Sequence, residues 1–168
     1  MSWSEPSRRG ALALGLAGLV SGCFRPMLAE TGEAAALRGR IAMPNVRGRE
    51  TYHLRRTLEE RLGTPREPDY RLEVELAFRE RGLAISQDAS VTRRTIIATA
   101  NWRLLRRGAD APVLSSREIA QAGYNETGAL YATDVAARDI ERRLSRDLAE
   151  RISRDILARA DTVAAAAP

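Results

Sequence analysis

The residue whose chemistry can be assigned most directly is Cys23, the single cysteine of the sequence. The segment before it has a charged, an apolar and a small-residue part, which are Arg8-Arg9, Ala11–Val20 and Ser21-Gly22. An apolar run of this length is too short to span a bilayer, which requires roughly 20 residues, but it is typical of a secretory signal peptide. We therefore predict that residues 1–22 are an export signal and not part of the fold.

The position of Cys23 directly after two small residues resembles the lipobox of bacterial lipoproteins. This resemblance implies cleavage before Cys23 and attachment of a diacylglycerol and an N-acyl chain to that residue. Several acyl chains anchor a protein stably, because each buried methylene contributes roughly 0.8 kcal/mol. Phe24 stands where an aspartate would retain many lipoproteins in the inner membrane, so we expect a location on the periplasmic face of the outer membrane. The alternative is an ordinary secreted protein with a free or disulfide-bonded cysteine.

The other groups that could do chemistry do not form a catalytic or metal-binding set. The only histidine, His53, lies in a predicted helix, and no serine, cysteine or cluster of metal ligands accompanies it at a defined spacing. The carboxylates alternate along predicted strands or pair with arginines along predicted helices. We therefore expect no enzyme activity, no metal and no cofactor beyond the lipid on Cys23.

The charge of the chain points to an anionic partner. All 27 basic side chains other than the histidine are arginine, they outnumber 22 acidic residues, and the formal net charge is +5. For an exported protein, the anion that such a surface meets is lipid phosphate. Nucleic acid is disfavoured by export and by the near balance of the charges, which leaves no concentrated basic stripe.

Two amphipathic helices are predicted from the spacing of leucine and isoleucine. Over residues 50–62 leucines recur every four residues, and Gly63 follows as a stop signal. Over residues 128–159 the same spacing is kept by Ile140, Leu144, Leu148, Ile152 and Ile156. The other faces carry arginine–carboxylate pairs four residues apart, which is typical of a solvated face.

Four strands are predicted around these helices. Residues 41–46 contain Pro44, which places this strand at a sheet edge. Residues 70–78 alternate strictly between apolar and polar side chains, with residues 83–85 as a candidate extension, and strands over 91–105 and 113–124 follow. Tyr70, Phe78 and Trp102 fall in phase with aliphatic residues, so we interpret them as core and not as a pocket for acyl chains.

The order of these elements predicts an α+β fold. Two helices with one apolar stripe each need a sheet to cover, which gives a two-layer sandwich of order β-α-β-β-β-α with a mostly antiparallel four-stranded sheet. We place this domain at residues 40–160, a tether at 23–39 and a disordered tail at 161–168. About 146 residues remain after signal cleavage, which suits one domain.

This series of motifs resembles the LptE family of lipopolysaccharide-assembly lipoproteins, in its short alphaproteobacterial form. The matching segments are Cys23-Phe24-Arg25-Pro26, the helix at Tyr52–Leu62, Tyr70–Val74, Val91–Arg93, and the terminal helix after Tyr124-Asn125. The resemblance implies a non-catalytic protein that plugs the large outer-membrane barrel LptD, binds lipopolysaccharide and helps deliver it to the outer leaflet.

The resemblance also implies which residues contact the lipid A phosphates. Carried over by motif position, these are Arg93 with Arg94, and then Arg117 in the following strand. Arg93 falls on the polar phase of its strand, where a guanidinium could donate two charge-assisted hydrogen bonds to a phosphate. Arg94 falls on the apolar phase, so it would either lie in solvent at the strand end or open a bulge.

One other function remains open at this point. An accessory lipoprotein of a lipid-trafficking ABC transport system would share the lipid anchor and have an α/β domain of similar size. The partner separates the two functions, since one protein would copurify with a large β-barrel and the other with an inner-membrane transporter.

Overall fold

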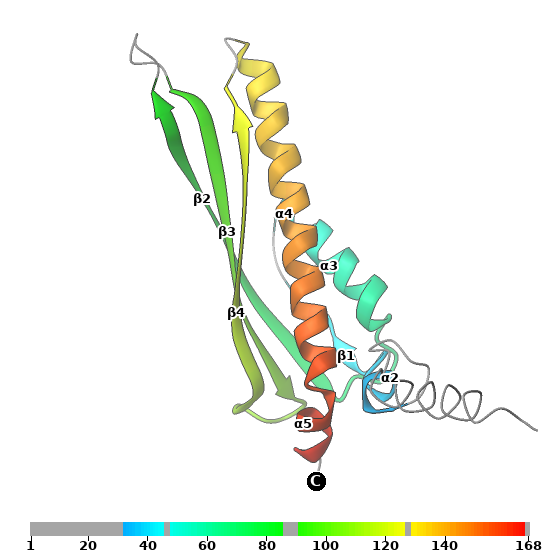
Figure 1. Cartoon of the computed structure of the whole chain (residues 1–168). Helices are drawn as coiled ribbons and strands as arrows, with labels where there is room; N and C mark the ends of the chain where they lie inside the picture. The colour runs from blue at the N-terminus through cyan, green and yellow to red at the C-terminus, as the bar shows by residue number, and fades with distance from the viewer. Residues whose placement is uncertain (1–31, 46–47, 86–90, 127–128, 167–168) are drawn as a thin grey trace, which may run out of the picture.

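The computed structural model describes residues 32–45, 48–85, 91–126 and 129–166 of the chain (Figure 1). The elements follow in the order α2 (Glu33–Ala36), β1 (Ile41–Ala42), α3 (Arg49–Leu62), β2 (Tyr70–Ile85), β3 (Val91–Arg106), β4 (Pro112–Asn125), α4 (Leu130–Ala158) and α5 (Ala160–Ala165). The predicted α+β architecture is confirmed, because a four-stranded mixed sheet packs against the helices. None of the described helices is both long and apolar enough to cross a membrane.

The sheet is a long antiparallel meander with a short parallel strand at one edge. Its strand order is β1-β2-β3-β4, and only the β1–β2 pair is parallel. The pairs Val74–Trp102 and Trp102–Ser116 set the register across the three long strands. Over residues 70–82 of β2, 93–104 of β3 and 114–125 of β4, even-numbered residues therefore face the helices and odd-numbered residues face the opposite way. We call this second side the outer face.

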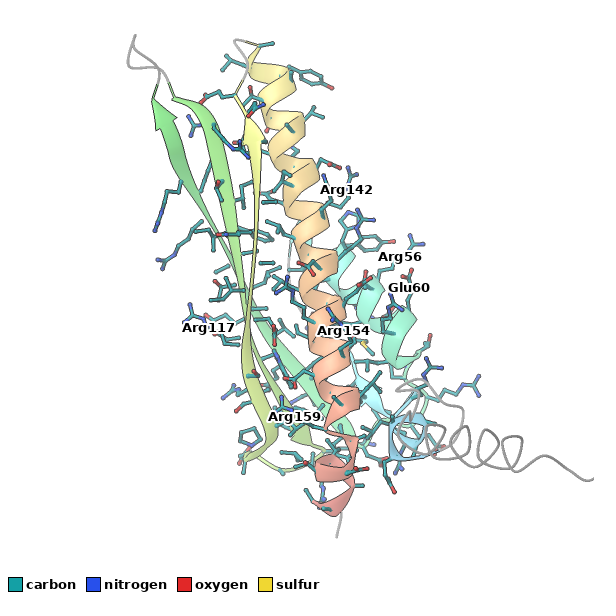
Figure 2. The ribbon with its side chains drawn as sticks, in the orientation of Figure 1. Arg56, Glu60, Arg117, Arg142, Arg154 and Arg159 are labelled. Atoms are coloured by element: carbon teal, nitrogen blue, oxygen red, sulfur yellow. The ribbon has the colours of Figure 1, made fainter. Side chains whose placement is uncertain are left out.

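The core lies between the sheet and the apolar stripes of α3 and α4. Every leucine of the α3 stripe is fully buried, and the α4 stripe is buried throughout, from Ile140 at 7% exposure to Ile156 at 0%. Trp102 lies beneath α4 at 1% exposure, and the guanidinium carbon of Arg159 is 5.5 Å from the centre of its ring (Figure 2). This cation–π contact joins the C-terminal end of α4 to the middle of the sheet.

A close approach of two glycines joins the start of the sheet to the end of α3. The Gly39 N–H donates to the Leu62 carbonyl at 2.9 Å. Both Gly39 and Gly63 have positive φ angles, and a Cβ on Gly63 would lie only 3.0 Å from the Gly39 nitrogen. Glycine is therefore required at Gly63, both for its conformation and for space.

Two short helices extend beyond the predicted domain, one at each end. Part of the predicted tether is the short helix α2, and Leu37 after it is buried in the core. Part of the predicted disordered tail is α5, in which Ala160 and Val163 are buried. These two residues continue the α4 stripe at a spacing of three to four, so the apolar surface that they bury explains why the chain stays helical.

The long edge strand β4 has a side-chain partner in α4. Arg151 donates from Nη1 to the backbone carbonyl of Ile119 at 3.1 Å, and its other nitrogens bind Asp147 at 2.9 and 3.1 Å. The asparagine at position 125 and the proline at position 112 mark the ends of this strand. Arg151 thus binds the open edge of β4 near its centre.

The helices cover only part of the sheet. Strand β2 has 16 residues and spans about 53 Å, whereas α3, which lies beside α4 (Figure 1), has 14 residues and spans about 21 Å. Burial along the helix side of β2 follows this mismatch, since Tyr70 and Leu72 are buried while Leu76 and Phe78 are only partly buried. The half of the sheet toward the β2–β3 connection is called the distal half below.

Truncating the α4 stripe should test this packing. Leu148 is fully buried, so Leu148→Ala should lower the free energy of unfolding by about 2–5 kcal/mol through lost burial and the cavity left behind. The matched control is Leu130→Ala on the same helix, where 87% of the side chain is exposed and the cost should stay within about 0.5 kcal/mol. Chemical denaturation monitored by circular dichroism measures both, and equal effects would contradict the packing.

Candidate functional site

The residues predicted to bind lipid do not all lie within the described structure. Cys23 and the signal segment belong to residues 1–31, which lie outside it. Within the described ranges there is no group of three or more histidine, cysteine or acidic side chains that could hold a metal ion. The groups left to consider are therefore the arginines of the sheet and the surfaces around them.

Arg93 and Arg117 lie on the outer face of the sheet, far apart. Arg93 is paired with Asn125, and Arg117 is paired with Asn101 eight residues further along β3, which corresponds to about 26 Å. Arg117 points away from α4 (Figure 2). Both side chains are exposed, but at this separation they cannot bind the same phosphate group.

Arg94 lies on the opposite side of the sheet from Arg93 and is held by carboxylates. It donates to Glu126 from Nε at 2.8 Å and from Nη2 at 3.2 Å, and to Glu80 from Nη1 at 3.4 Å. It therefore does not lie free at a strand end, and it keeps regular pairs with Gly82 and Tyr124; the register shifts of the β2–β3 pair follow, between Gly82 and Ala84 and between Ala84 and Ile85. The structure thus separates Arg94 from Arg93 and Arg117.

Tyr124 completes this network, which we call the distal polar cluster: Glu80, Arg94, Tyr124 and Glu126. The Tyr124 hydroxyl donates to the same carboxylate oxygen of Glu80 that accepts from Arg94. The pKa of Tyr124 is raised to about 12, mainly by burial and secondly by the hydrogen bond to Glu80. The hydrogen bond from Arg94 lowers the pKa of Glu126. At neutral pH the cluster therefore contains a neutral phenol and an ionised Glu126, and it joins β2, β3 and the end of β4.

Two arginines that the resemblance did not indicate lie near Arg93. Arg79 and Arg81 occupy odd positions of β2, so they share the outer face with Arg93, and Arg81 is paired with Thr95, two residues from Arg93. All three are exposed, and none is ion-paired with another described residue. Extending the two-residue alternation of this strand from Arg71 to Arg81 would have placed Arg79 and Arg81 on the outer face from the sequence alone.

Arg93 leans across the outer face toward β4. Its Nε lies 3.6 Å from the point that a Cβ on Gly123 would occupy. The glycine leaves room for the guanidinium to lie over the strand. The distal outer face, defined here by Arg79, Arg81 and Arg93, can therefore bind an anion without first breaking an ion pair within the described structure.

A groove lies on the helix side of the distal half, about 630 Å³ in volume. One wall is the N-terminal half of α4, the start of α3 closes one end with His53, and Glu80 of the distal polar cluster also lines it. The His53 ring contacts Tyr52 edge-on, with ring centres 5.4 Å apart. Among the described residues, His53 belongs to no group of side chains that could hold a metal ion.

Comparisons with known proteins agree on family and fold. A family model described as "LptE: Lipopolysaccharide-assembly" matches residues 28–156. A putative lipoprotein from Caulobacter crescentus is similar in structure, with a TM-score of 0.61 and 24% identity over 82% of this chain and 99% of that one. No curated protein sequence matches the chain.

Two further solved structures share the fold at lower identity. The rare lipoprotein B from Shewanella oneidensis has a TM-score of 0.60 and 12% identity, covering 73% of this chain and 97% of its own. A minor lipoprotein from Acinetobacter baumannii has a TM-score of 0.57 and 17% identity, covering 70% of this chain and 89% of its own.

The distal polar cluster can be tested by titrating tyrosine. In a spectrophotometric titration, Tyr124 should ionise near pH 12, and Glu80→Gln should bring this value closer to the ordinary 10 because the charged acceptor is lost. Because the pKa of Tyr124 is higher in the folded than in the unfolded protein, its contribution to the free energy of unfolding is fully present below pH 10. This contribution is lost as the pH rises through about 12. Tyr124→Phe should remove the late transition, and its persistence in that variant would contradict the assignment.

Proposed function

Since the chain belongs to the LptE lipopolysaccharide-assembly family, we propose that it binds lipopolysaccharide and delivers it to the outer leaflet together with an LptD-type β-barrel. The observation that carries the proposal is the family match, which covers residues 28–156. In this function the chain catalyses no reaction. It acts as a lipoprotein anchored through acyl chains on Cys23, on the periplasmic face of the outer membrane.

The distal outer face supports binding of the lipid A phosphates. Of the residues inferred by resemblance, Arg93 lies there, and Arg79 and Arg81 join it from β2. A guanidinium can donate two parallel hydrogen bonds to a phosphate, and charge-assisted bonds of this kind are worth about 1.5–3 kcal/mol each. Arg117 would contact a different part of the ligand or of the barrel, because it lies about 26 Å along the sheet.

The outer face also supports the proposed barrel partner. No described helix packs on this side of the sheet, and its exposed residues are mainly polar, including Asn101, Arg103, Ser115 and Gln121. The interior of a transmembrane β-barrel is polar as well. A sheet with one apolar side covered by its own helices and one open, mainly polar side is compatible with such a lumen.

Lipidation of Cys23 can be tested by mass and by location. Cys23→Ser should leave an unprocessed precursor that does not fractionate with the outer membrane, because no acyl chain can be attached. Phe24→Asp is the matched variant, since it should still be lipidated but stay in the inner membrane. An unmodified Cys23 thiol on the mature wild-type protein, measured by mass spectrometry, would contradict the proposal.

The anion site can be tested by charge reversal. The double variant Arg81→Glu/Arg93→Glu should bind lipopolysaccharide roughly tenfold or more weakly in isothermal titration calorimetry, since it removes two phosphate donors. The wild-type affinity should fall with added salt, because exposed charges are screened over about 10 Å at 0.1 M ionic strength.

The control for this prediction is Arg66→Glu/Arg154→Glu, which changes the net charge equally at two exposed positions outside the distal half. It should leave lipopolysaccharide binding close to that of the wild type. Equal losses in both double variants would mean that net charge alone acts and that the distal outer face is not a site.

A further inference from the structure

Strand β2 presents an open edge over most of its length. Strand β1 pairs only with Tyr70 and Arg71 at the start of β2, and no other described strand lies beside β2 on that side (Figure 1). An edge of this kind carries unpaired backbone N–H and C=O groups, on which another strand can add. The side chains beside the edge decide which strand fits it.

The backbone groups of this edge belong to the even-numbered residues of β2. The Asp69 carbonyl accepts from the Arg107 N–H at 2.6 Å, in line with the β2–β3 register. Because an antiparallel pair alternates between residues that exchange hydrogen bonds and residues that do not, the odd-numbered residues of β2 are bonded to β3. The even-numbered residues therefore point their N–H and C=O groups to the open edge. The Tyr70 N–H agrees, since it donates to the Arg40 carbonyl on the β1 side at 3.1 Å.

On the outer face, the charges of β2 are arranged in opposite order on the two sides of Ala77. Glutamates stand two and four residues before it, at Glu75 and Glu73, and arginines stand two and four residues after it, at Arg79 and Arg81. Two copies of β2 that run antiparallel about Ala77 therefore bring Glu75 of each copy opposite Arg79 of the other. Glu73 and Arg81 meet in the same way. Opposite charges directly across an antiparallel pair are favourable and like charges are not, so this edge is complementary to itself.

The inner pair of these charges has no partner within one copy. Glu75 and Arg79 are exposed, and neither forms an ion pair with another described residue. They lie four residues apart on one strand, about 13 Å, so they cannot reach each other within the chain. Glu73 is already paired with Arg71 and Arg103, so the outer pair contributes less to association than the inner one does.

The apolar side chains on the helix side of β2 fit the same register. Leu76 and Phe78 are only partly buried in a single copy. About Ala77, Leu76 of one copy lies opposite Phe78 of the other, so each shields the other from water. A register shifted by two residues places Ala77 opposite Glu75 or Arg79 and leaves one of these two charges unmatched. The register about Ala77 is therefore the favoured one.

We propose that two copies of this chain associate through the open edges of β2, antiparallel about Ala77, so that their sheets become continuous. The interface is isologous, because the same surface serves both copies and a two-fold axis passes between the two Ala77 residues. The proposal goes beyond the proposed function and does not depend on it. Because Arg79 and Arg81 also belong to the distal outer face, the dimer neutralises part of that face.

The charge pairs can be tested by reversal and rescue. Sedimentation equilibrium of the full-length mature protein in detergent should show a monomer–dimer equilibrium. Glu75→Arg and Arg79→Glu should each weaken dimerisation roughly tenfold or more, because the two-fold axis makes each change replace two attractions by two repulsions. An equimolar mixture of the two single variants should form heterodimers, and Glu75→Arg/Arg79→Glu should dimerise like the wild type. In both cases opposite charges face each other again.

The matched control is Arg66→Glu, which makes the same charge change as Arg79→Glu at an exposed position outside the distal half. It should leave dimerisation close to that of the wild type. Circular dichroism verifies that every variant is folded.

A cross-link tests the register itself. In a non-hydrogen-bonded antiparallel pair the two Cα atoms lie about 4.5 Å apart, which suits a disulfide, so Ala77→Cys should form a covalent dimer under mild oxidation. Ser115→Cys is the matched variant, since it is exposed on the same face but lies on β4. It should stay largely unlinked on a non-reducing gel.

Three results would overturn the proposal. They are a wild-type protein that stays monomeric at the highest concentration reached, single charge variants that dimerise like the wild type, and an Ala77→Cys variant that links only to the barrel. The last result would mean that a strand of another protein occupies this edge. None of these experiments measures lipopolysaccharide binding, so the proposed function stands or fails separately.

Discussion

The structure depends on the burial of one long apolar stripe of α4 against the sheet. The stripe from Ile140 to Ile156 is buried over about four turns and continues through Ala160 and Val163 of α5. It packs over β3 and β4, while α3 packs beside it toward β1 and β2 (Figure 1). Without this contact, the even-numbered side of the sheet would present Trp102 and its neighbours to water.

The same packing explains why the two halves of the molecule are built differently. In the half near α5, both helices cover the sheet, and the core is continuous. In the distal half the strands extend beyond α3, and polar contacts among Glu80, Arg94, Tyr124 and Glu126 replace apolar ones. Polar networks exposed to water contribute less stability than buried apolar contacts do, so the distal half is the more easily adapted to a ligand.

Much of the fold could be predicted because the periodicities are clean. Strict alternation from Tyr70 to Phe78 and the four-residue spacing of α4 each identify one element and its buried side. The short helices α2 and α5 were not predicted, because segments rich in small residues such as alanine show no clear apolar periodicity. Only the docking of Leu37 and Val163 in the core shows that these segments are folded.

The candidate site was harder to predict from the sequence, for a geometric reason. Neighbouring residues of a strand point to opposite sides, so Arg93 and Arg94 serve different surfaces although they are adjacent in the chain. Arg79 and Arg81 come close to Arg93 only through the β2–β3 pairing, which a linear motif does not contain. The groove depends on the relative lengths of α3 and β2, and no residue pattern states that relation.

The hydrogen bond from Arg151 to the Ile119 carbonyl has a consequence for solubility. Strand β4 is 14 residues long, and no described strand pairs with its other edge. An open edge of this length is a template on which another chain can add a strand and begin to aggregate. Because Arg151 occupies the middle of that edge from α4, an incoming strand cannot pair along its full length while the helix is docked. Partial detachment of α4 would therefore expose an aggregation-prone edge as well as the core.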